Sequence, residues 1–530
     1  MGNVAMVGAN GAGDSVVAVA ETPRQRFSVP LAVLSGLCLA AAFPSLDIAP
    51  LAWVGLVPLL LAIRGRSPGA AFALGWVAGT VFYLVTCYWI VYTIGHYTAL
   101  PVPLAAMILL LMASVLACYH AAFAAGVSWF ERRGLPVVWL GPALWVTLEW
   151  LRGWFFIGFP WASLGYSQYR FHSLVQMAEL TGVYGVSAVL VLFNMVVAAV
   201  LMTPGARARR NLPALATLTL LVVALIGFGR WRVAQLAAKP PAGQLRVGLA
   251  QGNIEQDKKW DPAFQDETMT RYRQLTVEAA REHPALIAWP ETAAPFFFQE
   301  PGPRRDEVIA LARETGVPIV FGSPAFHQLA DGELQQLNRA YLVDATGRER
   351  GTYDKMQLVP FGEYVPFANV LFFVSQIVTA VGQLGAGVVP TVFAIPGAHF
   401  GTLICYEGIF PALTRRFVNG GADFLVNVTN DAWYGDTSAP YQHLAQAAFR
   451  TVENRVPMVR AANTGISAII DADGRIRWQG PLFQTLSHVD EIRWPGVRTI
   501  YTRFGDVFAW ACAAVTVGAV LLGVRARRRA

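Results

Sequence analysis

Residues 400–410 read FGTLICYEGIF, an apolar run that leads directly into Cys405, Tyr406 and Glu407. The run predicts a buried β-strand, so a thiol, an aromatic hydroxyl and a carboxylate follow one another where that strand ends. Comparable runs recur between residues 244 and 492: LRVGLAQGNI, ALIAWPETA, PIVFGSPAF, RAYLVDATG, DFLVNVTND, VPMVRAANTG, SAIIDADG and SHVDEI. Helical patterns lie between several of them, notably AFQDETMTRYRQLTVEAARE, RRDEVIALARETG and PYQHLAQAAFRTVENR. Strands that alternate with helices predict an α/β domain, and nearly continuous apolar strands indicate that both sheet faces are covered.

The rest of the chain has a different composition. Of 530 residues only 14% are charged, and residues 27–237 contain fifteen Asp, Glu, Lys or Arg and no lysine. Apolar runs of about 20 residues cross a bilayer, which predicts about eight transmembrane helices near 27–44, 48–63, 69–94, 101–130, 136–157, 173–203, 212–234 and 505–524. We therefore expect a disordered cytoplasmic tail (1–26), a transmembrane domain of about seven helices (27–238), a water-facing domain (239–495), and a last helix with a basic cytoplasmic tail (496–530).

The arginines predict the orientation of these helices, because cytoplasmic loops carry the excess of Lys and Arg. Arginine clusters precede the first predicted span and follow the second, fourth, sixth and eighth: Arg24/Arg26, Arg64/Arg66, Arg132/Arg133, Arg207/Arg209/Arg210 and the tail RARRRA. Both termini are then cytoplasmic, and the domain 239–495 faces the periplasm. The net charge of +7 is largely accounted for by these clusters, so it does not indicate a nucleic-acid partner.

Five cysteines are present, and Cys38, Cys87, Cys118 and Cys512 lie in predicted spans. Cys405 is the only cysteine of the water-facing domain, which by the predicted topology lies in an oxidising compartment. An unpaired thiol there is either an inert buried cysteine or a reactive group.

Polar residues at three strand ends favour the reactive group. Glu291 follows ALIAWP, Lys355 and Glu363 lie in TYDKMQLVPFGEYVPF, and Cys405 ends its own strand. A thiolate is a nucleophile, a carboxylate can exchange the thiol proton, and an ammonium group can stabilise an oxyanion. The eight histidines form no metal-binding motif and no G-x-S-x-G elbow is present, so we expect neither a metal nor a cofactor.

The segments WPETA, YDKMQLVPFGEYVPF and ICYEGIF resemble the Glu, Lys and Cys motifs of the nitrilase (carbon–nitrogen hydrolase) superfamily. With the fused spans, residues 30–523 resemble the membrane-bound apolipoprotein N-acyltransferase family, also through QGNIEQDKKWD and EWLRGWFFIGFPWASLGYSQ. The resemblance implies an α-β-β-α sandwich in which Glu291 is the base, Lys355 the oxyanion partner and Cys405 the nucleophile. It further implies supporting roles for Glu363, Tyr406 and Glu407, and substrate contacts for Trp260 and Trp433.

The implied reaction transfers an acyl chain from a phospholipid to the N-terminal amine of a diacylglyceryl-cysteine apolipoprotein, through a Cys405 thioester. The implied enzyme is a monomer of the bacterial inner membrane, and residues 366–387 are its predicted mobile lid. One alternative is a membrane-anchored amidase or nitrilase that hydrolyses a small amide; another is a lipid-binding or transport protein with an inactive hydrolase domain. Glu149 and Arg152, three residues apart on a predicted helix, are expected to form a structural pair that braces the membrane part against the water-facing domain.

Overall fold

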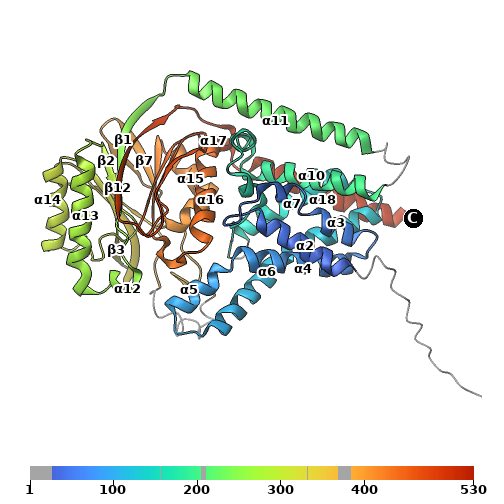
Figure 1. Ribbon diagram of the computed structural model, residues 1–530, viewed down its shortest axis with the longest axis horizontal. Helices are drawn as coiled ribbons and strands as arrows, with labels where there is room; N and C mark the ends of the chain where they lie inside the picture. The colour runs from blue at the N-terminus through green and yellow to red at the C-terminus, as the bar shows by residue number, and fades with distance from the viewer. Residues whose placement is uncertain (1–26, 156, 204–210, 331, 368–382, 530) are drawn as a thin grey trace, which may run out of the picture.

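The computed structural model describes residues 27–155, 157–203, 211–330, 332–367 and 383–529. Figure 1 shows an α/β part on one side and a bundle of helices on the other. The chain builds most of the bundle first, crosses to the α/β part after α11 (Leu212–Ala238), and returns to the bundle as α18 (Val507–Arg529). The predicted N-terminal tail, residues 1–26, lies outside the described residues.

Each predicted span contains helix. Among the described residues, five helices are long and apolar enough to cross a membrane: α4 (Pro68–Thr86), α6 (Val102–Arg132), α10 (Val183–Met202), α11, and the Val507–Arg525 part of α18. Shorter helices occupy the first two predicted spans, α2 (Ser28–Ala41) and the stretch Ala49–Ile63, and α7 (Val137–Trp154) occupies the fifth. Helices suit this setting because their backbone polar groups bond within the segment and not with lipid.

Two predicted spans are interrupted. The span 69–94 divides after α4, and a separate helix, α5 (Trp89–Tyr97), turns toward the α/β part. The span 173–203 divides at Gly182, where φ is +64°. A Cβ atom at Gly182 would also meet the ring of Tyr501 at 2.7 Å. A left-handed residue in tight contact stops a helix, so α10 begins only after Gly182.

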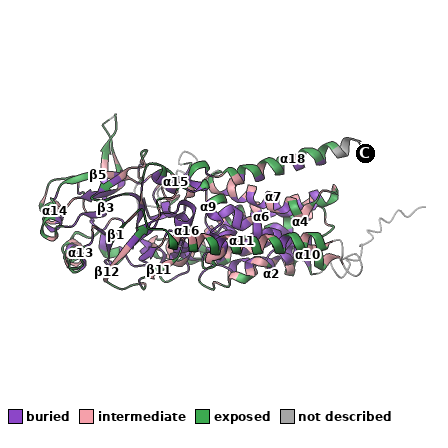
Figure 2. Cartoon of the chain, turned by 90° about the horizontal axis from the view of Figure 1, so that it is seen from above, coloured by how far each residue is buried: buried purple, intermediate pink, exposed green. Residues whose placement is uncertain are grey.

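The outer helices present apolar side chains to the surroundings. Figure 2 shows much of α11 and α18 exposed, and the exposed fractions are 70% for Leu220, 62% for Val223 and 61% for Leu522. Apolar surface of this extent is what a membrane covers. The helical part is therefore that of a multi-pass membrane protein.

The α/β part contains two six-stranded sheets, with strand orders β12-β1-β2-β3-β4-β5 and β11-β10-β9-β8-β7-β6. In each sheet three neighbouring strands are parallel, β1/β2/β3 and β7/β8/β9, and the outer strands pair antiparallel. The strands are β1 (Gly243–Gln251), β2 (Leu286–Ala288), β3 (Ile319–Gln328), β4 (Leu334–Val343), β5 (Glu349–Asp354), β6 (Val392–Ile395), β7 (Ala398–Ile404), β8 (Phe424–Thr429), β9 (Met458–Ala462), β10 (Ala468–Ile470), β11 (Ile476–Gln479) and β12 (Leu486–Trp494).

Helices cover the outer face of each sheet. The first sheet packs against α13 (Gln265–Ala280) and α14 (Pro303–Thr315), and the second against α15 (Pro411–Asn419) and α16 (Ala439–Asn454). The α-β-β-α sandwich expected from the sequence is therefore confirmed. Because α16 lies between the second sheet and the helical bundle, nearly all of its residues are buried.

The membrane part also holds the segment that faces α16. Glu149 accepts a hydrogen bond from Leu164 N (2.7 Å), and Arg152 donates to the carbonyl of Trp161 (2.8 Å). Trp161 in turn donates its Nε1 to Gln442 Oε1 of α16 at 2.7 Å. Glu149 and Arg152 thus brace the membrane part against the α/β part, as the sequence predicts, through their contacts with the segment 161–164.

Candidate active site

Cys405 lies at the junction of β7 and a short 3₁₀-helix, η5 (Cys405–Ile409). Its φ is +52°, in the left-handed region, and the residue is 5% exposed. A non-glycine residue in this conformation costs about 1 kcal/mol or more and is found mainly where function requires it. The sharp turn after a buried strand fixes the direction of the thiol.

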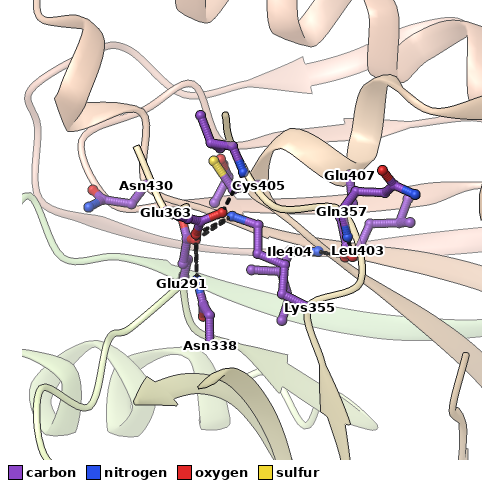
Figure 3. Close-up of polar contacts among 12 residues, drawn as sticks. Glu291, Asn338, Lys355, Gln357, Glu363, Leu403, Ile404, Cys405, Glu407 and Asn430 are labelled. Atoms are coloured by element: carbon purple, nitrogen blue, oxygen red, sulfur yellow. Dashed lines mark hydrogen bonds and ion pairs between the residues drawn. The ribbon is translucent and has the colours of Figure 1, made fainter. Parts of the chain in front are cut away.

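The other predicted catalytic residues come from the opposite sheet. Glu291 lies in the turn after β2, and Lys355 directly follows β5. Figure 3 shows their side chains converging with that of Cys405 between the two sheets. The structure thus brings together the three residues that the sequence singles out at strand ends.

Lys355 is held by two carboxylates. Its Nζ lies 3.3 Å from Glu291 Oε1 and 2.7 Å from Glu363 Oε1, and the lysine side chain is 1% exposed. Asn338 Nδ2 donates to the same two oxygens, at 2.7 and 3.3 Å (Figure 3), and Glu363 Oε2 accepts from Val359 N at 2.8 Å. Burial alone would lower the pKa of Lys355, but Glu291 and Glu363 raise it well above its ordinary value. The lysine is therefore a permanent cation in the site.

The thiol of Cys405 is protonated in the resting site. Burial raises the pKa of Cys405 well above its ordinary value, the Glu291 carboxylate raises it further, and Lys355 opposes both. Glu291 Oε2 is buried and has no hydrogen-bond partner among the residues that the structure describes. One carboxylate oxygen is thus bound to the lysine, and the other is free to take the thiol proton.

Glu407, predicted as a supporting residue, ties the two sheets together. Its Oε1 accepts from Tyr353 Oη (2.7 Å), Met356 N (2.7 Å) and Gln357 N (3.1 Å), and its Oε2 accepts from Ile404 N (2.7 Å). Burial raises the pKa of Glu407 to about 7, although these hydrogen bonds favour the ionised form. The carboxylate therefore joins the segment that follows Lys355 to the residue that precedes Cys405.

Tyr406 is buried beside Cys405. Its ring packs edge-on against Phe410, with centroids 5.0 Å apart. Its hydroxyl has no hydrogen-bond partner within the described part of the chain. A buried hydroxyl without a partner is costly. The Tyr406 hydroxyl can therefore form a hydrogen bond with a substrate that enters the site.

The two predicted substrate-contacting tryptophans differ in their surroundings. Trp260 is 47% exposed and lines, with Phe297, a cavity of about 490 Å³. Trp433 instead packs against the membrane helix α5: its ring lies 4.8 Å from that of Tyr97, and its carbonyl accepts from Thr93 Oγ1 at 3.0 Å. Trp433 thus links the α/β part to the helical bundle.

Comparisons with known proteins match both parts of the chain. Residues 35–196 match the apolipoprotein N-acyltransferase N-terminal domain, and residues 246–490 match the carbon–nitrogen hydrolase family. An apolipoprotein N-acyltransferase of Geobacter metallireducens is 45% identical over 505 residues, which cover 94% of this chain and 95% of that protein.

The chain belongs to the apolipoprotein N-acyltransferase family. Relatives of the same name from Methylococcus capsulatus and Azotobacter vinelandii are 35% and 34% identical, each match covering 94% of this chain and 96% of the relative. Among solved structures, an amidase from Nesterenkonia sp. is 19% identical with a TM-score of 0.38, covering 50% of this chain and 95% of that one. As a member of this family the protein is an N-acyltransferase that acts in the final acylation step of bacterial lipoprotein maturation.

Sequence reasoning missed a second lysine of this N-acyltransferase site. Lys259 is 2% exposed, and its Nζ donates to the backbone carbonyl of Glu291 at 2.9 Å. Burial lowers the pKa of Lys259 to about 8, and Glu291 and Cys405 oppose that shift. No ion pair among the described residues includes Lys259. Its neighbour Lys258 is half exposed, so the doublet KK alone does not indicate which lysine is buried.

Asn338 was also missed. It lies in β4, within the stretch LQQLNRAYLV, and it donates to both Glu291 and Glu363. A buried asparagine inside a strand is a usable signal because buried amides need partners. Most of the predicted lid is residues 368–382, which lie outside the described residues.

Proposed function

We propose that the N-acyltransferase reaction proceeds through a thioester on Cys405, with Glu291 as the proton carrier and Lys355 as the oxyanion partner. The observation that supports this most directly is the buried Glu291–Lys355–Glu363 cluster, which faces a protonated thiol and leaves Glu291 Oε2 free. The acyl donor is a phospholipid, and the acceptor is the amine of a diacylglyceryl-cysteine lipoprotein.

In the first half-reaction the thiol proton moves to Glu291 Oε2 while the sulfur attacks the ester carbonyl carbon of the phospholipid. The tetrahedral intermediate collapses with cleavage of the ester C–O bond, and the departing lysophospholipid oxygen takes the proton back from Glu291. A thioester and a lysophospholipid result. One difficult transfer is thereby divided into two easier ones.

In the second half-reaction the neutral acceptor amine attacks the thioester carbonyl carbon. Glu291 takes a proton from the nitrogen as the C–N bond forms, the C–S bond breaks, and the proton passes to the sulfur. The product is an amide, and the thiol is regenerated. Because water would hydrolyse the thioester, burial of Cys405 favours transfer over hydrolysis.

Lys355 can serve both tetrahedral intermediates. A lysine ammonium has three N–H donors, and Glu291 and Glu363 occupy two of them. The third is available to the oxyanion. The two carboxylates hold the ammonium in place, so stabilisation needs no rearrangement during the reaction.

The proposed site is placed on the periplasmic side of the bacterial inner membrane, with both termini cytoplasmic. Arg132 Nε donates to Arg66 O at 3.3 Å, and Arg133 donates to Gly523 O near the end of α18. Figure 1 shows this end of the bundle directed away from the α/β part. These contacts support the topology that the arginine clusters predict. One chain supplies the whole proposed catalytic cluster, which supports a monomer. We further propose that the domains are residues 27–238, 239–495 and 496–530.

The thioester can be tested by mass spectrometry. Purified protein is incubated with phospholipid and no acceptor, then digested, and the peptide that contains Cys405 is analysed. We expect an added acyl mass that hydroxylamine removes, and that is absent from Cys405→Ser. Cys118→Ser, which changes an exposed cysteine of the membrane part, is the matched control and should keep the acyl mass. An active enzyme with unmodified Cys405 would refute the thioester, and ammonia released from small amides would favour an amidase.

A further inference from the structure

Next to Cys405 lies a buried cluster of polar side chains that the reaction scheme does not use. Its members come from β8, β9, α16 and the turn after β8, and each is no more than 1% exposed: Thr429, Asp431, His443 and Arg460. Four buried polar groups together are costly unless each is hydrogen-bonded. Their bonds lead to the backbone and the thiol of the nucleophile.

His443 binds the backbone of Cys405. Its Nε2 lies 3.1 Å from the Cys405 carbonyl oxygen, which also accepts a long bond from Asn427 Nδ2 at 3.5 Å. A carbonyl oxygen can only accept, so His443 Nε2 carries a hydrogen. This bond restrains the one residue of the nucleophile turn that adopts a left-handed conformation.

Arg460 and Asp431 hold the other ring nitrogen of that histidine. Arg460 Nη2 lies 3.1 Å from His443 Nδ1 and 2.5 Å from Asp431 Oδ2, and Asp431 Oδ1 lies 3.2 Å from the same Nδ1. These contacts fix the orientation of the ring, with Nε2–H directed at the Cys405 carbonyl. Burial lowers the pKa of His443, Arg460 lowers it further, and Asp431 opposes them.

Thr429 extends the same cluster to the sulfur. Its hydroxyl donates to Asp431 Oδ1 at 2.9 Å, and a hydrogen bond from the same side chain lowers the pKa of the Cys405 thiol. A hydroxyl has one hydrogen and two lone pairs. That hydrogen can turn to the sulfur when negative charge develops on it.

We propose that Thr429, Asp431, His443 and Arg460 form a network that positions the nucleophile. His443 holds the Cys405 carbonyl and thereby the direction of the thiol. Arg460 and Asp431 hold the His443 ring in the orientation that directs Nε2–H at this carbonyl, and Thr429 supports the developing thiolate. The inference rests on the proposed function, because it assigns these residues to the thioester-forming step.

The membrane part packs against this network. The ring of Trp161 lies 5.9 Å from that of His443, and Trp161 Nε1 donates to the adjacent Gln442 at 2.7 Å. Trp161 is fully buried and is itself held by Arg152 of α7. The helical bundle therefore contacts the network that orients the catalytic thiol.

Two substitutions at His443 separate positioning from folding. The amide nitrogen of glutamine reaches the place of histidine Nε2, whereas that of asparagine reaches only the place of Nδ1. We expect His443→Asn to slow single-turnover acylation of Cys405 by about tenfold or more, as for the loss of one buried hydrogen bond. His443→Gln should retain most of the rate. Thermal unfolding of both variants measures the effect on stability, and we expect a lower melting temperature than wild type for both.

Equal acylation rates for His443→Gln and His443→Asn would overturn the inference, because the rate would not follow the Nε2-type donor. If the wild-type protein forms no acyl-Cys405, the proposed function fails first. If wild type forms it and the two variants do not differ, only the positioning role fails.

A second pair of variants applies if neither His443 variant folds. Thr429→Ser keeps the hydroxyl, and Thr429→Val removes it at similar volume. Iodoacetamide alkylation of Cys405, followed at its peptide across pH, should shift to higher pH in Thr429→Val and stay near wild type in Thr429→Ser. The other charged groups that act on the sulfur are unchanged in both variants: Lys259, Glu291, Lys355 and Asp431. The same pH dependence for both variants would overturn the role of Thr429.

Discussion

Replacing Glu407 with glutamine tests how its carboxylate holds the residues around Cys405 and Lys355 together. The substitution keeps the size of the side chain but exchanges one acceptor oxygen for an NH₂ donor. In the wild-type protein Oε1 faces Tyr353 Oη and the backbone N–H groups of Met356 and Gln357, and Oε2 faces Ile404 N. Backbone N–H groups only donate, so whichever way the amide turns, its NH₂ meets at least one donor.

The less costly orientation points the NH₂ at Ile404 N. It removes one charge-assisted hydrogen bond, which contributes about 1.5–3 kcal/mol. It also leaves a buried N–H unpaired on the residue directly before Cys405. We therefore expect the free energy of unfolding to fall by about 1.5–3 kcal/mol, and the acylation rate to fall by about tenfold to a hundredfold if the thiol shifts accordingly.

The assay is single-turnover acylation of Cys405 by phospholipid, followed by mass spectrometry, together with thermal unfolding of each variant. Glu255→Gln is the matched control: Glu255 is 70% exposed and paired with Lys258, and an exposed pair contributes about 1 kcal/mol or less. Wild-type acylation and stability in Glu407→Gln would refute the reasoning that Glu407 holds the turn through an acceptor-only group.

Lys259→Met should lower activity yet raise the melting temperature at pH 7, because the depressed pKa of about 8 means that burial of the cation costs stability below that pH. This increase in melting temperature should shrink as pH rises from 8 toward 10.5, because the wild-type lysine is then neutral in the folded protein. A lower melting temperature than wild type at pH 7 would contradict the prediction. Asn338→Leu removes a donor from both carboxylates and should slow acylation about tenfold or more; an unchanged single-turnover rate would speak against it. Gly182→Ala should lower the melting temperature because φ is +64° and its Cβ would lie 2.7 Å from Tyr501. Gly69→Ala, whose Cβ meets no atom within 4 Å, should leave the melting temperature nearly unchanged. Equal shifts in the two variants would refute the claim that Gly182 is required by its conformation and its contact with Tyr501.

The sequence was sufficient for most of the α/β fold because buried strands must be apolar. Each of the nine predicted strands overlaps an observed strand. The three missed strands, β5, β6 and β11, all lie at sheet edges. An edge strand has one free side and needs no continuous apolar run, and ERGTYD and IRWQ accordingly show none. The third, VFAI, is apolar but only four residues long.

The candidate site was predictable where chemistry interrupts an apolar run, as at Glu291 and Cys405. It was not predictable where a buried polar residue forms hydrogen bonds to another polar group of the site. Lys259 looks like a solvated lysine, and Thr429 and His443 look like ordinary strand and helix residues. Their burial depends on contacts between elements far apart in the chain, which local patterns do not encode. Likewise, Gly182 ends a span through its contact with Tyr501, more than 300 residues away in the chain.

A chase experiment tests most directly whether acyl transfer passes through Cys405. The enzyme is first loaded with a radiolabelled acyl chain from phospholipid, separated from remaining lipid, and then mixed with a diacylglyceryl-cysteine peptide. Label should move from Cys405 to the peptide amine in one turnover with no phospholipid present, and Cys405→Ser should load none. Label that stays on the protein, or that reaches the peptide only when phospholipid is added again, would contradict the thioester mechanism.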